Sequence, residues 1–163
     1  MGVEIERKYL VKARRLPGLP PGRILVQGYI RTGSLTTVRV RVDGDRSYLT
    51  VKGPSSENGL VRSEFEYAIP PGDARQILDQ LCDGGVVEKT RYRPPAGDLT
   101  WEVDVFGGRN EGLVMAEVEL PDESVDPESP DWIDVEVTGD PRYSNMNLAQ
   151  RPWPEWAAAD ASQ

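Results

Sequence analysis

Acidic and basic side chains recur at every second position in seven short segments of this 163-residue chain, and both charge signs occur in the set. Clustered carboxylates are the ligands that hard cations such as Mg²⁺ and Mn²⁺ prefer, and guanidinium and ammonium groups bind phosphate oxygens. In a β-strand, residues two apart point to the same face, so each segment would carry its charges on one side and mostly apolar residues on the other. The segments are residues 4–8, 39–41, 50–52, 62–66, 89–91, 102–104 and 117–119.

The charges of these segments nearly cancel, because seven basic side chains meet eight acidic ones. If they enclosed a common space they could pair with each other, which makes buried charge tolerable. Two divalent cations would bring the sum to about +3, which suits a small polyanion such as a short phosphate chain. The basic residues are Lys8, Arg39, Arg41, Lys52, Arg62, Lys89 and Arg91, and the acidic residues are Glu4, Glu6, Glu64, Glu66, Glu102, Asp104, Glu117 and Glu119.

The charged faces could instead point to solvent around an apolar core, which is where charged side chains usually lie. The residue types favour the inward orientation. These positions use Arg and Glu more than the Lys, Ser and Thr of an ordinary solvated face, and Arg suits bidentate recognition of phosphate. The chain has no glycine-rich phosphate-binding loop of the P-loop type, so side chains must bind any phosphate.

Eight segments have strand character and are separated by turn-forming residues, with a tight hairpin turn expected at residues 43–44. A closed barrel of about eight strands has an interior that is filled by side chains or holds one small ligand. We therefore predict a mainly β fold of the α+β class, an eight-stranded antiparallel closed β-barrel that forms a tunnel, with a few flanking helices. The expected strands are residues 3–11, 24–31, 37–43, 47–52, 62–69, 87–94, 99–106 and 113–120.

The segments outside these strands predict little further regular structure. One helix is expected at residues 74–82, where Asp73 can cap the start and Gly84 can follow the end. A second, short helix is expected at residues 143–150, and residues 121–131 are expected to form an acidic loop.

Length and composition limit the function classes. The chain is expected to form one domain, residues 1–150, followed by a partly flexible tail, residues 151–163. Its net charge of −8 argues against nucleic acid and anionic membrane as partners. The single cysteine, Cys82, cannot form a disulfide within the chain, which favours a cytoplasmic location. The absence of histidine excludes histidine-based acid–base chemistry and Ser-His-Asp triads.

The motif E-x-E-x-K at residues 4–8 is followed in order by R-x-R, T-x-K, R-x-E-x-E, K-x-R and E-x-E. This series, over residues 2–150, resembles the CYTH superfamily, also called triphosphate tunnel metalloenzymes. The resemblance implies a barrel tunnel and an enzyme that acts on a small-molecule triphosphate with one or two Mg²⁺ or Mn²⁺ ions. The oligomeric state, monomer or homodimer, stays open.

The resemblance also implies roles for individual residues. Glu64 and Glu66 would either reach the metal through water or hold basic residues in place, and the roles of Glu102 and Arg142 stay open. The implied triphosphate ligands are Lys8, Arg39, Arg41, Lys52, Arg62, Lys89 and Arg91. The implied metal ligands are Glu4, Glu6, Glu117 and Glu119, with Asp104 as a further candidate that could instead hold basic residues.

Residues 27–30 and 87–92 are similar to small bacterial members of the superfamily that hydrolyse inorganic tripolyphosphate. That similarity implies that Tyr29 and Lys89 act as a proton-transferring pair. Neighbouring arginines should lower the pKa of Lys89, which would make it usable as an acid or base near neutral pH. Alternatively, Tyr29 packs in the wall and Lys89 only binds phosphate. Residues 136–145 resemble the same group, in which a C-terminal helix can close one tunnel mouth.

The sequence thus predicts a hydrolase that acts on phosphoanhydride bonds and converts inorganic tripolyphosphate to pyrophosphate and orthophosphate with a divalent metal. Adenylate cyclase and thiamine triphosphatase or other nucleoside-triphosphatase activities remain alternatives, because one fold can carry several activities. A non-catalytic polyphosphate-binding module is a third alternative, although it would not need four glutamates that resemble metal ligands.

Overall fold

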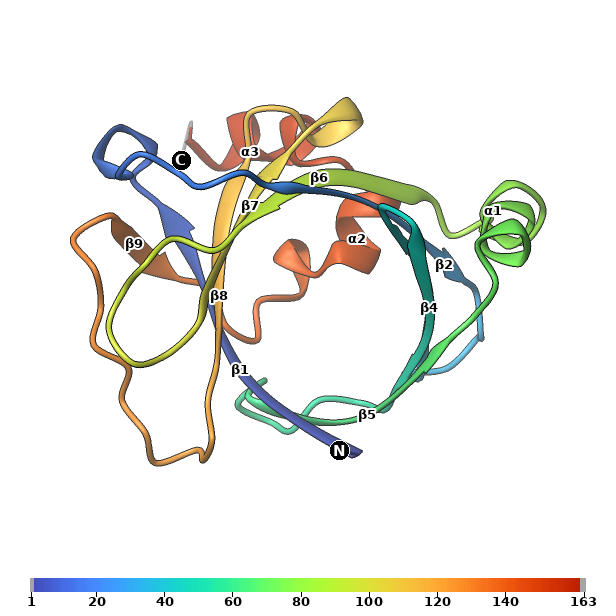
Figure 1. The fold of residues 1–163 in the computed structure, drawn as a ribbon, viewed down its shortest axis with the longest axis horizontal. Coiled ribbons are helices and arrows are strands. Elements are labelled where there is room, and N and C mark those ends of the chain that lie inside the picture. Colours follow the sequence, from blue (N-terminus) through green and yellow to red (C-terminus); the bar gives the residue numbers. More distant parts are fainter. Residues whose placement is uncertain (1, 162–163) are drawn as a thin grey trace.

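The strands of the chain hydrogen-bond into one antiparallel sheet that closes on itself, as the computed structural model of residues 2–161 shows (Figure 1). The strand order is β5-β4-β3-β2-β6-β7-β8-β1-β9, and a further pairing of β5 with β1 closes eight strands into the predicted barrel. The strands are β1 (Gly2–Val11), β2 (Arg23–Ile30), β3 (Thr37–Asp43), β4 (Arg46–Lys52), β5 (Val61–Ala68), β6 (Val86–Tyr92), β7 (Trp101–Phe106), β8 (Val114–Glu119) and β9 (Ile133–Glu136).

The predicted hairpin turn between β3 and β4 is confirmed. Asp43 pairs with Arg46, which leaves a two-residue turn. Gly44 stands first in that turn with a φ of 63°, a left-handed conformation that residues with a side chain rarely adopt.

Strand β1 is shared between two partners along one of its edges. Residues 2–5 pair with β5, whereas Tyr9 and Val11 pair with β9, and β8 lies along the opposite edge. Two loops lie beside the stretch between these pairings, since the amide of Glu6 bonds to Leu60 and the amide of Val137 bonds to Lys8. The short strand β9 was not expected from the sequence.

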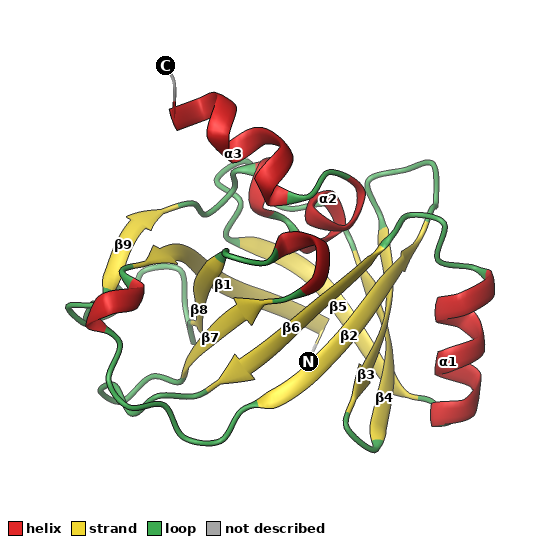
Figure 2. Cartoon of the chain, turned by 90° about the horizontal axis from the view of Figure 1, so that it is seen from above, coloured by secondary structure: helices red, strands yellow, loops and turns green. Residues whose placement is uncertain are grey.

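The described part of the chain contains three α-helices: α1 (Pro71–Gln80), α2 (Asn145–Gln150) and α3 (Trp153–Ala161). Helix α1 lies outside the barrel beside β3 and β4 (Figure 2). It begins three residues earlier than predicted, because Pro71 starts it and Asp73 lies in its first turn instead of capping it. None of the helices in the described part of the chain has the length and apolar character that a membrane crossing requires.

Most of the buried apolar residues in the described chain fall into two clusters, one inside the barrel and one outside it. Outside, Trp101 of β7 packs against Tyr9 of β1 and against Trp132, which follows the predicted acidic loop. Inside, at one end of the barrel, Tyr29 and Met115 pack with Leu148 of α2 and with residues of α3. The charged segments line the space between the inner cluster and the opposite mouth.

The region predicted to be a partly flexible tail contains helix α3, and residues 162–163 lie outside the described part of the chain. Trp156 anchors this helix to the barrel. Its side chain is 7% exposed, packs in the inner cluster and donates its indole N–H to the carbonyl of Arg151.

Candidate active site

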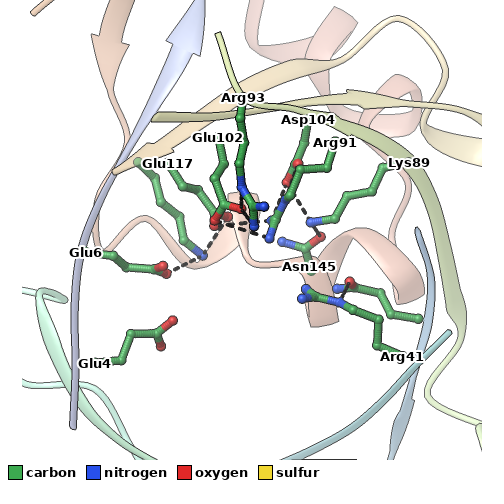
Figure 3. Close-up of polar contacts among 12 residues, drawn as sticks. Glu4, Glu6, Arg41, Lys89, Arg91, Arg93, Glu102, Asp104, Glu117 and Asn145 are labelled. Atoms are coloured by element: carbon green, nitrogen blue, oxygen red, sulfur yellow. Dashed lines mark hydrogen bonds and ion pairs between the residues drawn. The ribbon is translucent and has the colours of Figure 1, made fainter. Parts of the chain in front are cut away.

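The inward faces of the strands enclose a cavity of about 860 Å³ whose wall is mostly ionic (Figure 3). The predicted inward orientation of the charged residues is therefore confirmed. The predicted site residues in this wall are Glu4, Glu6, Lys8, Arg39, Arg41, Lys52, Lys89, Arg91, Glu117 and Glu119. Arg62 and Tyr29 line a second cavity that adjoins the first, and Asp104 lies in the barrel wall with 1% of its surface exposed.

Two smaller cavities adjoin the main one at opposite ends of strand β3. One, of about 400 Å³, includes Thr37 in its wall and shares Lys8 and Arg39 with the main cavity. The other, of about 480 Å³, includes Asp43 and shares Arg41 and Arg91 with it. Together the three cavities extend along the barrel interior on both sides of the main cavity.

Basic and acidic side chains pair across the cavity wall, both within a strand and between strands. The ammonium nitrogen of Lys52 lies 2.8 Å from Glu4 Oε2 and 3.9 Å from Glu64 Oε2. Lys8 lies 3.5 Å from Glu6 and 4.0 Å from Glu117. This part of the wall is thus a network of opposite charges that joins β1, β4, β5 and β8.

Glu6 of β1 and Glu117 of β8 lie on adjacent strands near Lys8 and differ sharply in acidity. Burial, with the nearby carboxylate of Glu117, raises the pKa of Glu6 to about 7. Burial would also raise the pKa of Glu117, but Lys8 and Arg91 outweigh it and lower that pKa to about 2. A cation placed here would relieve the repulsion between these two groups, so the donor set suits a divalent metal.

The acidic side chains do not converge as they stand. Among the described residues, no group of three or more potential metal-ligating side chains lies close enough to hold an ion. Glutamate side chains have several rotatable bonds, so the carboxylates of β1 and β8 could turn toward a common point without a change in the barrel.

Asp104 binds two cations from the neighbouring strand. Its Oδ2 lies 2.7 Å from the ammonium of Lys89, and its two oxygens accept hydrogen bonds from Arg91 at 2.8 and 2.9 Å. Arg91 and Asp104 stand directly opposite each other in the β6–β7 pairing. Burial alone would raise the pKa of Asp104, but Lys89 and Arg91 outweigh it and lower that pKa well below its usual range.

Lys89 is fully enclosed, and its pKa is lowered to about 8 chiefly by burial, with Arg91 and Arg41 adding to the shift against the attraction of Asp104. The predicted direction of this shift is confirmed, although burial is its main cause. Besides Asp104, the ammonium donates to the side-chain oxygen of Asn145 at 2.9 Å.

Tyr29 belongs to a different hydrogen-bond chain from Lys89. Its hydroxyl accepts a hydrogen bond from Gln27 at 2.7 Å, and Gln27 accepts one from Arg41 at 2.9 Å. In the described structure Tyr29 and Lys89 are not hydrogen-bonded to each other, so their action as a proton-transferring pair stays a prediction.

The two glutamates of β5 contact basic residues. Glu66 accepts hydrogen bonds from Thr50 at 2.8 Å and from Arg39 at 3.4 Å, and Glu64 lies near Lys52. Arg62 donates to the hydroxyl of Thr37 at 3.2 Å. These contacts favour the interpretation that Glu64 and Glu66 hold basic residues in place.

Among the wall residues that sequence reasoning missed, Arg93 and Asn145 contact predicted site residues. Arg93 continues the alternation of Lys89 and Arg91 beyond the end of β6 and pairs with Glu102 at 2.9 Å, so the charge pattern itself could have found it. Asn145 comes from helix α2 and is a short polar residue without a charge pattern, so no local signal indicated its position in the wall.

Comparison with known proteins agrees with this geometry. The CYTH domain matches residues 2–152. A protein of Acetivibrio thermocellus named inorganic triphosphatase is 52% identical over 153 residues, which is 94% of this chain and 97% of that protein. A protein of Nitrosomonas europaea with the same name is 39% identical over 157 residues, which is 90% of this chain and 96% of that protein.

A solved structure shows the same arrangement of the chain. The crystal structure of the inorganic triphosphatase NE1496 superposes with a TM-score of 0.63 at 33% identity, over 90% of this chain and 97% of that one. The closed barrel, its ionic interior and these similarities over nearly the whole length lead to one conclusion: the chain belongs to the CYTH domain family.

Proposed function

We propose that this protein hydrolyses inorganic tripolyphosphate to pyrophosphate and orthophosphate in the barrel cavity. The observation that carries the proposal is the cavity of about 860 Å³, into which cationic groups of β1, β3, β4 and β6 point from several directions. Two relatives that align with nearly the whole chain bear the name inorganic triphosphatase, which supports the same substrate.

The basic residues are distributed around the cavity in a way that suits a chain of phosphates. A triphosphate offers non-bridging oxygens on every side, and a guanidinium group can bind two of them at once. Burial, together with Arg39 and Arg91, lowers the pKa of Arg41 to about 10, so the crowded cations favour an anion between them. The proposed triphosphate ligands are Lys8, Arg39, Arg41, Lys52, Arg62, Lys89 and Arg91.

The proposed cofactor is Mg²⁺ or Mn²⁺, as one ion or two. Glu4, Glu6, Glu117 and Glu119 would hold it, because their carboxylates project from β1 and β8 into the cavity wall. A bound divalent ion polarises phosphoryl oxygens and makes water a better nucleophile. Asp104 was also expected among the metal ligands, but both of its oxygens accept hydrogen bonds from basic side chains, which favours an anchoring role.

The reaction proposed is a direct attack of water on a terminal phosphorus. An oxygen–phosphorus bond forms on the water side while the bridging bond breaks; the attacking water releases a proton to solvent, and the departing pyrophosphate takes up a proton. With a pKa of about 8, Lys89 is mostly protonated at neutral pH and can donate that proton to the leaving oxygen. The surrounding cations stabilise charge on the transferred phosphoryl group, which supplies most of the rate in phosphoryl transfer.

A substrate panel tests the proposal. Tripolyphosphate, ATP, thiamine triphosphate and longer polyphosphate are each incubated with the protein and Mg²⁺ or Mn²⁺, and orthophosphate, pyrophosphate and cyclic nucleotide are measured. We expect tripolyphosphate to react fastest, with equal amounts of orthophosphate and pyrophosphate. Cyclic nucleotide from ATP would indicate the cyclase alternative, and binding without turnover would indicate a polyphosphate-binding module.

The cytoplasmic location, the choice between monomer and homodimer, and the absence of nucleic-acid and membrane partners stay predictions. These predictions concern the location and the assembly of the protein. The proposed site itself is built from residues of a single barrel.

A further inference from the structure

Helix α2 is not part of the sheet (Figure 1), yet it supplies one polar side chain to the wall of the main cavity. Among the described residues that line this cavity, Asn145 is the one that α2 supplies, and the others belong to the strands or directly follow β6. It also lines the adjoining cavity of about 400 Å³, so it stands where the two meet, together with Lys8, Arg39 and Lys52.

The contact with Lys89 fixes which way the Asn145 amide points. An ammonium group has only donors, so the group that faces it must be the carbonyl oxygen, which lies 2.9 Å from the Lys89 nitrogen. The amide nitrogen is therefore turned away from Lys89, with two N–H donors. Among the described residues it has no hydrogen-bond acceptor, and Figure 3 shows the side chain among the charged groups of the wall.

Helix α2 is held firmly in this place. The hydroxyl of Ser144 accepts the amide hydrogen of Asn147 at 3.1 Å at the start of the helix. At the other end, the buried side chain of Asn110 donates to the carbonyl of Leu148 at 3.0 Å, and Leu148 is fully buried in the inner apolar cluster. A hydrogen-bond donor on a helix that is fixed in this way is already oriented before a ligand binds.

We propose that Asn145 is a substrate-binding residue whose amide N–H groups donate to a non-bridging phosphoryl oxygen while its carbonyl holds Lys89. The inference rests on the proposed function, because it takes a triphosphate as the ligand of the cavity. The amide adds a directed hydrogen bond to the cationic wall without adding charge. It also couples helix α2 to the reaction, since α2 places this donor beside the ammonium of Lys89.

The alternative is that Asn145 only positions Lys89 and does not bind the substrate. One substitution distinguishes these two roles. Asn145→Asp keeps an oxygen that accepts from Lys89 but replaces the N–H donors by an acceptor. We expect the KM for tripolyphosphate and its dissociation constant to rise about 10- to 100-fold, the effect of one hydrogen bond to a charged group. Asn145→Ala, which removes both contacts without adding charge, is expected to weaken binding to a similar degree and also to lower kcat.

Two control variants lie on the same helix. Met146→Asp places a carboxylate on the neighbouring residue, which lines the same adjoining cavity, without removing the amide. Gln150→Ala changes an exposed position of α2. We expect both to bind tripolyphosphate within about threefold of the wild type, because neither removes the proposed donor.

The measurements are steady-state kinetics with Mg²⁺ or Mn²⁺ and calorimetric titration of tripolyphosphate in the presence of a chelator, where no turnover is expected. Normal binding by Asn145→Asp would overturn the inference, and so would an equal loss in Met146→Asp, which would indicate long-range charge repulsion alone. Turnover by the wild type decides the proposed function separately. If tripolyphosphate bound without being hydrolysed, the titrations would still decide the role of Asn145.

Discussion

At the scale of single residues, the pKa of Glu6 is the property that relates most directly to metal binding. Its carboxyl is buried beside Glu117, and its pKa of about 7 lies well above the ordinary value of 4.5. A raised carboxyl pKa means that the folded state favours the protonated form. Stability is therefore lost as the pH rises from about 4.5 to 7, unless a cation compensates for the ionised group.

Glu6→Gln tests this reasoning in the metal-free protein. We expect the variant to be more stable than the wild type above pH 7, by about 3 kcal/mol, and no more stable than it near pH 4.5. Urea denaturation at several pH values measures the difference. Mn²⁺ should stabilise the wild type but not the variant, and equal stabilisation of both would show that Glu6 takes no part in metal binding.

Asp104 gives a second prediction, because it is the buried partner of two cations. Asp104→Asn leaves Lys89 and Arg91 without their carboxylate, so we expect a loss of about 3–5 kcal/mol in the free energy of unfolding. Denaturation at neutral pH measures it. Glu136→Gln is the matched control, because it breaks the more exposed ion pair with Arg7 and should cost less than about 1 kcal/mol. Similar losses of stability in both variants would show that burial does not make the ion pairs of Asp104 more important than the exposed pair.

At the scale of elements, helix α1 depends on a close approach to β2. A side chain added at Gly28 would place its Cβ 2.8 Å from Cys82 Sγ and 2.8 Å from a methyl carbon of Leu78. Gly28→Val should therefore lower the free energy of unfolding by about 1–3 kcal/mol, as overpacking does.

The matched control for this element is Gly72→Ala in α1, where an added Cβ meets nothing within 4 Å. Because alanine reduces the freedom of the unfolded chain, this variant should gain about 0.4–1 kcal/mol. Thermal or urea denaturation of both variants checks the pair, and a destabilised Gly72→Ala variant would show that the packing of α1 was misjudged.

The elements also show what the sequence could predict. The alternation of charged and apolar residues in segments such as 62–66 determines which face of each strand points inward, and the eight barrel strands lie within two residues of the predicted bounds. Strand β9 was missed because four residues that pair along part of one edge give too short an alternation to stand out. Helix α3 was missed because its stability comes from the tertiary contacts of Trp156.

The site was predictable to a similar extent and for the same reason. Charged residues on strand faces could be placed together once the barrel was assumed, as for Lys8 and Glu117, which stand opposite each other in the β1–β8 pairing. Pairings between particular atoms were not predictable. Asp104 could have faced a metal or a cation, and only the packed geometry shows it held by Arg91 and Lys89.

At the scale of the whole molecule, a bound triphosphate would join strands that are distant in the chain. Its proposed contacts on β1, β3, β4, β5 and β6 exist together only in the closed barrel. We therefore expect tripolyphosphate with Mg²⁺, at a concentration about 100 times its dissociation constant, to stabilise the protein by about 2.7 kcal/mol. Thermal unfolding with equimolar orthophosphate as the control measures this, and equal shifts for both anions would argue against a site of triphosphate length.

The two-sided pairing of β1 has a consequence for the synthesis of the protein. The first strand to leave the ribosome needs β8 along one edge, with Glu6 opposite Glu119, before the ring can close. Until then one row of its backbone N–H and C=O groups lacks a strand partner, and such rows attract other chains. The β1–β8 contacts join residues that are far apart in the sequence, and contacts of this kind also slow folding. A nascent chain of this protein is therefore most vulnerable to aggregation in the interval before its last barrel strand emerges.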